Sequence, residues 1–256
     1  MSSKIDKYLG NFTQRICSIL STKVVGIYLQ GSSAQNDFQN NKSDLDIVVV
    51  VDQSISDEEK ASLATYLDHQ NLPVPAAGLD LIIVHQNAIA SMAREPEYEF
   101  WFSTGVDWDT EVEWFGRTSE VLIFLATCAA QAKTVFGADA QRVFKPVPRY
   151  SLLQAITDVL EWHQTKIGDD LHDPLCQYSV LNASRAWMFA EVEKLGSKSE
   201  GGEWVLARDP DNNLVKNALL VRQGKSTISP EPEMVKTYLQ HVHDFCSGKL
   251  STISQI

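Results

Sequence analysis

The sequence lacks any long apolar run. Apolar stretches such as residues 47–51 are far shorter than the roughly 20 residues that a membrane-spanning helix needs. The first residues, MSSKIDKYLGNF, have no apolar core after their lysines, so they indicate an amphipathic helix rather than a secretory signal. We therefore expect no membrane association and a cytoplasmic location.

Recognisable metal-ligand spacing is also missing. The four cysteines, Cys17, Cys128, Cys176 and Cys246, share no ligand spacing, and most of them lie within apolar helical patterns. We interpret them as reduced structural thiols, because disulfide frameworks belong to smaller secreted chains. The six histidines form no convincing pair either: His241 and His243 are two residues apart, which places them on different faces of a helix.

Clusters of basic residues are absent. The chain has 22 Lys and Arg against 33 Asp and Glu, a formal net charge of −11, and its cations are scattered. A protein that follows a polynucleotide usually presents a basic face. We expect no nucleic-acid partner, and a template-dependent polymerase is the least favoured interpretation. An acidic balance is compatible with a cationic substrate.

The first half of the chain alternates helix and strand patterns. Residues 4–20 have helical spacing of apolar side chains, and residues 57–69 predict a helix that opens with the capping-box pattern of Ser56 and Glu59. Three β-branched runs predict buried strands: residues 24–31, 44–51 and 78–84. These patterns predict an α/β domain over residues 1–145.

The second half reads as helical throughout. Residues 121–137 predict one long helix that ends at Gly137. The prolines of KPVPRY, residues 145–150, disfavour helix and mark a candidate boundary. Beyond it, residues 152–163, 178–195 and 233–246 have helical periodicity, and no strand of comparable strength follows. We expect an all-helical domain over residues 150–256.

Two carboxylates stand on one face of the second predicted strand. Asp44 and Asp46 are two residues apart, so their side chains point the same way with Cα atoms roughly 7 Å apart. Like charges in this arrangement repel one another unless a divalent cation lies between them. Magnesium commonly takes one or two protein carboxylates together with substrate phosphates. The pair therefore predicts a Mg²⁺ site.

Two further features extend this pattern. The first strand ends in Gly31-Ser32, where glycine lets the backbone approach a phosphate and serine can donate to its oxygens. The third strand carries Asp80 among apolar residues. On a neighbouring strand Asp80 would lie beside the first pair, either as a third metal ligand or as a general base.

This order of motifs resembles the nucleotidyltransferase superfamily of DNA polymerase β type, whose pattern is G-S, then D-x-D, then a third acid. Within it, the chain is most similar to the aminoglycoside adenylyltransferase family that modifies streptomycin and spectinomycin. The resemblance covers roughly residues 22–225. It includes Arg94-Glu95 with Phe100-Trp101, VLNASRAWMF (residues 180–189), GSKSE (residues 196–200) and Glu203-Trp204. It implies an α+β nucleotidyltransferase domain with a mixed sheet, followed by a helical bundle that completes the active site.

The resemblance also implies roles for individual residues at the nucleotide. Ser32, after Gly31, would contact the ATP phosphates, and Ser43 would lie beside the metal-binding pair. Asp44 and Asp46 would bind Mg²⁺, and Asp80 would take the proton from the acceptor hydroxyl. Lys198 would reach the triphosphate from the helical domain.

The acceptor side departs more from the family. Trp101 would contact the acceptor, within an acidic aromatic stretch that also contains Trp108 and fits either a cationic sugar-like substrate or ordinary packing. Trp162 has the location of a second drug-stacking tryptophan, with a shifted spacing. Asp169, Asp170 and Asp173 are candidates for the acid that binds a cationic group, and we select Asp173. The family commonly has glutamate where this chain has Asp80.

Together these features predict a monomeric, ATP- and Mg²⁺-dependent adenylyltransferase that moves AMP onto a hydroxyl of a small cationic acceptor. An aminoglycoside or aminocyclitol such as streptomycin or spectinomycin is the expected acceptor. Two alternatives stay open. One is a nucleotidyltransferase acting on another acceptor, either a metabolite or a protein. The other is a non-catalytic nucleotide-binding regulatory module, against which the three intact aspartates argue.

Overall fold

The chain forms two compact units, Met1–Val147 and Pro148–Ile256, and each is described by itself. The computed structural model describes residues 3–39, 42–168 and 173–253. The division between the units falls within residues 145–150, where prolines interrupt the helical pattern. Among the described residues, no helix combines the length and apolar character needed to cross a bilayer.

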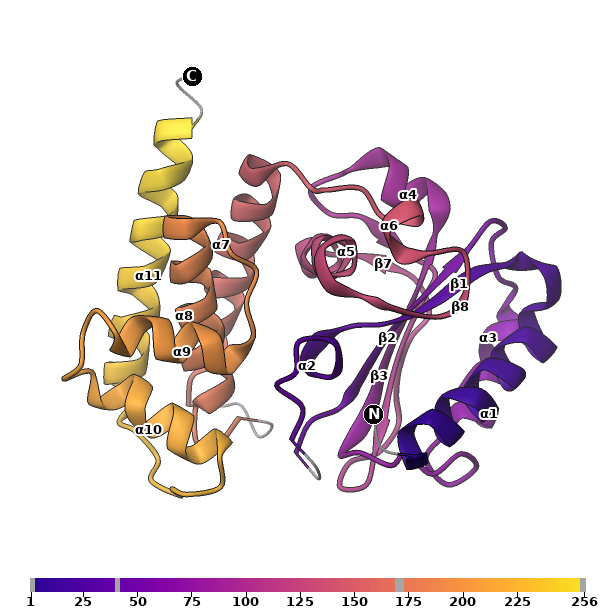
Figure 1. Cartoon of the computed structure of the whole chain (residues 1–256), viewed down its shortest axis with the longest axis horizontal. Helices are drawn as coiled ribbons and strands as arrows, with labels where there is room; N and C mark the ends of the chain where they lie inside the picture. The colour runs from indigo at the N-terminus through magenta and orange to yellow at the C-terminus, as the bar shows by residue number, and fades with distance from the viewer. Residues whose placement is uncertain (1–2, 40–41, 169–172, 254–256) are drawn as a thin grey trace. The chain divides into compact units, whose positions relative to one another are not determined.

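A mixed six-stranded sheet forms the centre of the first unit (Figure 1). Its order is β6-β5-β3-β2-β1-β8, and only the β2–β3 pair is parallel. The strands are β1 (Val24–Leu29), β2 (Leu45–Val51), β3 (Gly78–His85), β5 (Phe100–Gly105), β6 (Glu111–Glu113) and β8 (Lys133–Gly137). Two short strands, β4 (Glu97–Tyr98) and β7 (Gly116–Arg117), pair separately. The predicted fold class of this half is confirmed.

Helices cover both faces of this sheet. One face packs on α1 (Ser3–Leu20) and α3 (Asp57–Leu67), and its core includes Ile47, Val49 and Leu81. The opposite face packs on α5 (Ser119–Gln131), with α4 (Gln86–Ser91) and α6 (Ala140–Val143), around Val48 and Ile82. Alternation along the strands thus assigns each residue to one face. The short elements η1 (Ser21–Lys23) and α2 (Gly31–Ala34) flank β1.

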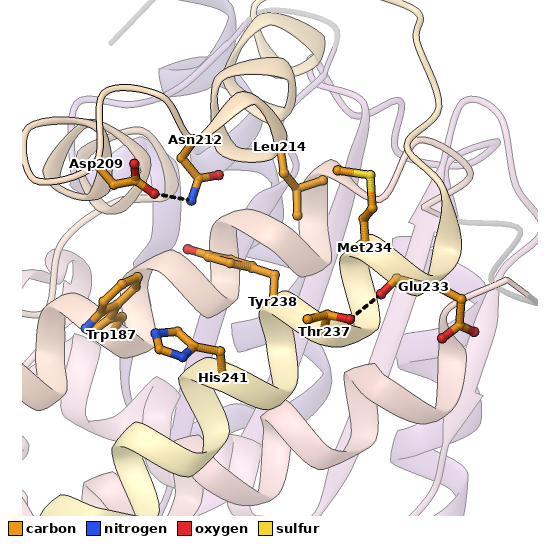
Figure 2. A pocket seen from close by; sticks show the side chains of 9 residues that line it. All are labelled: Trp187, Asp209, Asn212, Leu214, Glu233, Met234, Thr237, Tyr238 and His241. Carbon is orange, nitrogen blue, oxygen red and sulfur yellow. Dashed lines mark hydrogen bonds between the residues drawn. The ribbon is translucent and has the colours of Figure 1, made fainter.

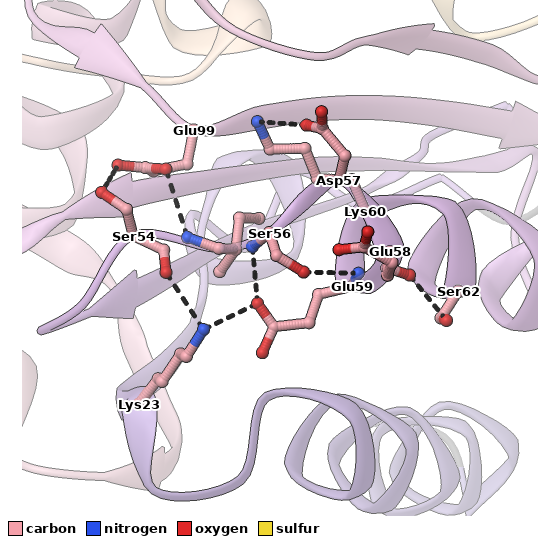
Figure 3. Close-up of polar contacts among 10 residues, drawn as sticks. Lys23, Ser54, Ser56, Asp57, Glu58, Glu59, Lys60, Ser62 and Glu99 are labelled. Atoms are coloured by element: carbon pink, nitrogen blue, oxygen red, sulfur yellow. Dashed lines mark hydrogen bonds and ion pairs between the residues drawn. The ribbon is translucent and has the colours of Figure 1, made fainter.

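The start of α3 is fixed by the predicted capping box, which is confirmed (Figure 3). The Glu59 N–H donates to the Ser56 hydroxyl at 3.3 Å, and the Ser56 N–H donates to the Glu59 carboxylate at 2.6 Å. Lys23 Nζ adds an ion pair to Glu59 at 2.7 Å. Partial burial opposes ionisation of Glu59, but the bonds from Lys23 and Ser56 dominate and lower its pKa.

The single long helix expected over residues 121–137 is wrong. Helix α5 ends at Gln131, Ala132 is extended, and residues Lys133–Gly137 form β8, which pairs with β1. Thr134, Val135 and Phe136 favour strand, and β1 supplies hydrogen-bond partners at the edge of the sheet. The aromatic strand β5 was also not predicted, although it lies between β3 and β6.

The second unit is helical throughout its described residues, as predicted. Its helices are α7 (Arg149–Lys166), α8 (Gln177–Val192), α9 (Lys198–Leu206), α10 (Asn213–Arg222) and α11 (Pro232–Ile253). Buried side chains such as Leu153, Leu181 and Leu239 form its core. Trp187 of α8 lies within an aromatic cluster, with ring centroids 6.0 Å from Trp204 and 5.1 Å from His241.

Candidate active site

The sheet brings two of the predicted carboxylates side by side. Asp46 of β2 and Asp80 of β3 are register partners in the parallel pair, on strands about 4.8 Å apart. Asp46 is two residues from Val48 and Asp80 is two residues from Ile82, and both of these apolar residues pack on the α5 face, so both carboxylates lie on that face. Asp44 directly precedes β2 and is half-buried. No group of three or more His, Cys, Asp or Glu residues gathers closely enough to hold a metal within the described ranges.

The donors present fit Mg²⁺ held by carboxylates. Asp44 and Asp46 offer the hard oxygen ligands that Mg²⁺ prefers, and substrate phosphates and waters commonly complete its octahedron. The nearby thiol does not compete. Burial, with a smaller contribution from the negative charge of Asp46, raises the pKa of Cys128, and Mg²⁺ prefers oxygen to sulfur ligands. The fit therefore rests on oxygen donors alone.

The Gly-Ser segment is packed directly against Asp46. Gly31 has φ +60°, and a β-carbon placed on it would lie 2.0 Å from Asp46 Oδ2. The Gln30 N–H donates to the Asp46 carbonyl oxygen at 2.9 Å. Ser32 and Ser33 follow in α2, where Ser32 is half-buried. Only glycine tolerates this approach, so the predicted phosphate-binding segment and the predicted metal ligand are neighbours.

Ser43 is hydrogen-bonded to Gln39 just before Asp44 in the chain. It is buried, its hydroxyl accepts the Gln39 N–H at 3.1 Å, and its own N–H donates to the Gln39 carbonyl oxygen at 3.0 Å. These bonds close the turn that leads into β2. Ser43 directly precedes Asp44 of the predicted metal-binding pair in the chain, and its hydroxyl is engaged in this local contact with Gln39.

Lys133 is a cation near this segment that the sequence analysis missed. Its Nζ donates to the Ser33 carbonyl oxygen at 2.8 Å, because the β1–β8 pairing sets Lys133 opposite Leu29. Because residues 121–137 were predicted to form one helix, the proximity of Lys133 to Ser33 was not expected. The β-branched and aromatic residues after Lys133 were the available signal of a strand.

Trp101 lies on the same face as Asp80 and contacts it. The two register pairs Ile82–Trp101 and Asp80–Ser103 place Trp101 diagonally across from Asp80, and its Nε1 donates to Asp80 Oδ1 at 2.7 Å. Trp108 has a packing role within the unit. A β-carbon on Gly78 would lie 2.2 Å from its ring, and its Nε1 donates to Ser103 Oγ at 3.1 Å.

In the helical unit, Lys198 is the first residue of α9, whose start is capped by the capping box of Ser197 and Glu200. Its Nζ lies 4.2 Å from the centroid of the Tyr178 ring, a cation–π arrangement that holds the ammonium at one end of α9. Trp162 of α7 is 51% exposed, which leaves its ring available to a ligand. Lys166 Nζ lies 5.6 Å from that ring.

Asp173 caps helix α8. Its carboxylate accepts the Tyr178 N–H at 3.0 Å, the Ser179 N–H at 2.9 Å and the Ser179 hydroxyl at 3.0 Å, and the residue is 5% exposed. This geometry gives Asp173 a structural role at the helix start. The alternative acids, Asp169 and Asp170, lie outside the described residues.

A groove of about 600 Å³ in the helical unit contains none of the predicted site residues (Figure 2). Trp187, Tyr238 and His241 line it together with two carboxylates. Asp209 accepts a bond from Asn212 at 3.1 Å, and Glu233 pairs with Lys236 at 3.5 Å. Both acids thus have partners within the unit. The groove therefore supplies no residue to the predicted adenylyltransferase site.

Comparison with known families matches both halves of the chain. Residues 14–95 match the family model "Polymerase beta, Nucleotidyltransferase". Residues 142–244 match "Aminoglycoside adenylyltransferase, C-terminal domain". The first match includes Gly31-Ser32, the D-x-D pair and Asp80, and the second includes Lys198.

Curated relatives and a solved structure agree with these matches. The spectinomycin 9-adenylyltransferase of Campylobacter jejuni is 22% identical over 76% of this chain and 75% of its own length. The Staphylococcus aureus enzyme of the same name is 22% identical over 77% and 76%. The crystal structure of spectinomycin adenyltransferase AAD(9) from Enterococcus faecialis with ATP and spectinomycin has the same fold. Its TM-score is 0.74 at 19% identity, over 94% of this chain and 98% of that one.

Proposed function

The chain belongs to the aminoglycoside adenylyltransferase family of nucleotidyltransferases, and on that premise we propose that it transfers AMP from ATP to a hydroxyl of a small cationic aminocyclitol. One observation carries the proposal: Asp46 and Asp80 are register partners, and Gly31 packs on the Asp46 carboxylate. These neighbouring positions on the sheet support nucleotide binding by the segment that begins at Gly31, metal binding by Asp46 and a role for Asp80 as the base.

In this proposal Asp44 and Asp46 hold Mg²⁺, which neutralises charge on the triphosphate when it is bound. Ser32 donates to phosphate oxygens, and Lys198 contributes a positive charge toward the triphosphate, as the family resemblance implies. Asp80 accepts the proton of the acceptor hydroxyl. The hydroxyl oxygen bonds to the α-phosphorus as the bond from that phosphorus to the bridging α–β oxygen breaks, and pyrophosphate leaves.

Spectinomycin is the first acceptor we propose, because the curated relatives are named for it. Streptomycin is the second. Two residues that the resemblance assigned to the acceptor have other contacts: Asp173 caps α8 and the Trp101 N–H donates to Asp80. Trp162, which is half exposed, keeps its proposed stacking role. A second candidate function is adenylylation of a different small acceptor, which the shorter side chain of Asp80 favours.

Mass spectrometry tests the proposal directly. Purified protein is incubated with ATP, magnesium and a panel of aminocyclitols that includes spectinomycin and streptomycin. We expect an acceptor heavier by one AMP unit, and we expect the Asp44→Asn variant to lose at least about a hundredfold in rate while its melting temperature stays near wild type. ATP binding without an adduct on any member of the panel would support the second candidate. Retention of most activity by Asp44→Asn would contradict the assigned chemistry.

A further inference from the structure

We propose that Trp101 is a positioning residue for Asp80, holding its carboxylate in the orientation that receives the acceptor's proton. The inference rests on the proposed function, in which Asp80 is the base. Its basis is the bond from Trp101 Nε1 to Asp80 Oδ1 at 2.7 Å. Hydrogen bonds from a neutral donor to a carboxylate are short and strong compared with neutral pairs, so this contact restrains the Asp80 side chain.

The indole is itself fixed, which is what a positioning group requires. Tyr98 packs edge-on against the Trp101 ring, with centroids 5.5 Å apart and planes at 88°, and Phe124 of α5 packs at 5.5 Å and 64°. Tyr98 is buried, and its hydroxyl donates to the Glu113 carboxylate on β6. Aromatic neighbours on two elements thus fix the direction of the Trp101 indole N–H. This N–H in turn fixes the orientation of the Asp80 carboxylate.

The shorter acid makes such a restraint useful. A base must lie within about 2.6–3.2 Å of the proton that it removes. Asp80 has a shorter reach than glutamate and depends on its strand position and on the direction of its carboxylate plane. The β3–β5 pairing fixes the strand position. A bond to Oδ1 fixes the plane in which Oδ2 lies, and Trp101 supplies that bond.

The family resemblance assigned Trp101 to the acceptor, and the two roles differ in a measurable way. Loss of an acceptor contact weakens binding and raises the acceptor KM. Loss of a positioning bond leaves the binding surface in place and lowers kcat, because misplacement of a reacting group by about 1 Å can cost about a hundredfold. The two effects separate if the N–H is removed while the ring is kept.

The experiment replaces Trp101 by its benzothiophene isostere, which exchanges the N–H for sulfur, and by phenylalanine. The matched control makes both changes at Trp108, which lies on the same face but donates to Ser103. We expect both Trp101 variants to lose about ten- to a hundredfold in kcat, with the acceptor KM within about twofold of wild type. We expect both Trp108 variants to stay within about threefold of the wild-type kcat. A raised KM at unchanged kcat for the Trp101 variants would overturn the positioning role.

A second readout does not require turnover and separates this inference from the proposed function. In protein with ¹⁵N-labelled tryptophan, the Trp101 indole proton is assigned by its loss in Trp101→Phe. We expect it to exchange slowly with solvent and to shift in Asp80→Ala, whereas the Trp108 indole proton does not shift. Failure of the wild type to modify any acceptor would sink the proposed function without touching this result. A Trp101 proton that exchanges rapidly and is unmoved in Asp80→Ala would sink the positioning role itself.

Discussion

Gly31 and Asp46 are in direct contact: a β-carbon at residue 31 would lie 2.0 Å from Asp46 Oδ2 and 2.6 Å from its Cγ. The contact joins the first residue of α2 to the beginning of β2, residues that are 15 positions apart. Glycine is required at residue 31 for two reasons: its φ is +60°, and no side chain fits against the Asp46 carboxylate. Through this contact the proposed phosphate-binding segment and the proposed metal-binding carboxylate depend on each other.

Gly31→Ala should therefore damage both stability and activity. The left-handed conformation costs a non-glycine residue about 1–2 kcal/mol, and the new methyl group must displace the Asp46 carboxylate. We expect a lower free energy of unfolding in urea and a fall in AMP transfer. The matched control is Gly10→Ala on α1, where a β-carbon meets nothing within 4 Å and helix propensity should increase stability by up to about 1 kcal/mol. Equal stability and activity of the two variants would contradict this account.

Lys198→Ala should raise the KM for ATP. We expect roughly a tenfold increase, because a cation that meets a triphosphate offsets charge that the protein otherwise leaves uncompensated. Steady-state kinetics with varied ATP measure it. Lys194→Ala is the control, since Lys194 is 56% exposed and pairs with Glu200 at 2.8 Å. A KM that changes equally in both variants would argue against a specific role for Lys198.

Asp173→Ala should act on stability rather than on the acceptor. Two backbone N–H groups and the Ser179 hydroxyl lose their acceptor at the start of α8, which we expect to cost about 1–3 kcal/mol. Chemical unfolding gives this value, and kinetics should show an acceptor KM close to wild type. Asp211→Ala, at an exposed position, controls for loss of one surface charge. Wild-type stability combined with a raised KM would reinstate Asp173 as an acceptor ligand.

Glu59→Gln should weaken the fold at neutral pH and have little effect in acid. The pKa of Glu59 is lower in the folded protein because Lys23 and Ser56 donate to its carboxylate. Its contribution is therefore present above the unfolded pKa, about 4.3, and is lost as the pH falls through the folded value. We expect a difference of about 1 kcal/mol at pH 7 that disappears once the pH has fallen below the folded pKa. Unfolding curves recorded at neutral pH and over a series of acid pH values measure it, and a difference independent of pH would contradict the ionic origin.

Local pattern predicted several elements because their signals lie within short windows. The β-branched runs of β1, β2 and β3 and the apolar spacing of α1 required no knowledge of distant residues. The Ser56–Glu59 capping box is equally local. The same approach failed for residues 133–137. The apolar residues of α5 run into them without a break, and only pairing with β1, about a hundred residues earlier, makes the extended form favourable.

The sequence by itself determined the chemistry that this protein can carry: the Gly-Ser segment, the two carboxylates of the D-x-D pair and a third acid on a later strand. Those assignments follow from residue types and from the two-residue period of a strand. Tertiary structure decided which groups meet. Strand register made Asp46 the neighbour of Asp80, β5 aimed the Trp101 N–H at Asp80, and Asp173 became a helix cap. The physical reason is that register and side-chain partners depend on contacts between residues far apart in the chain, which no local period encodes.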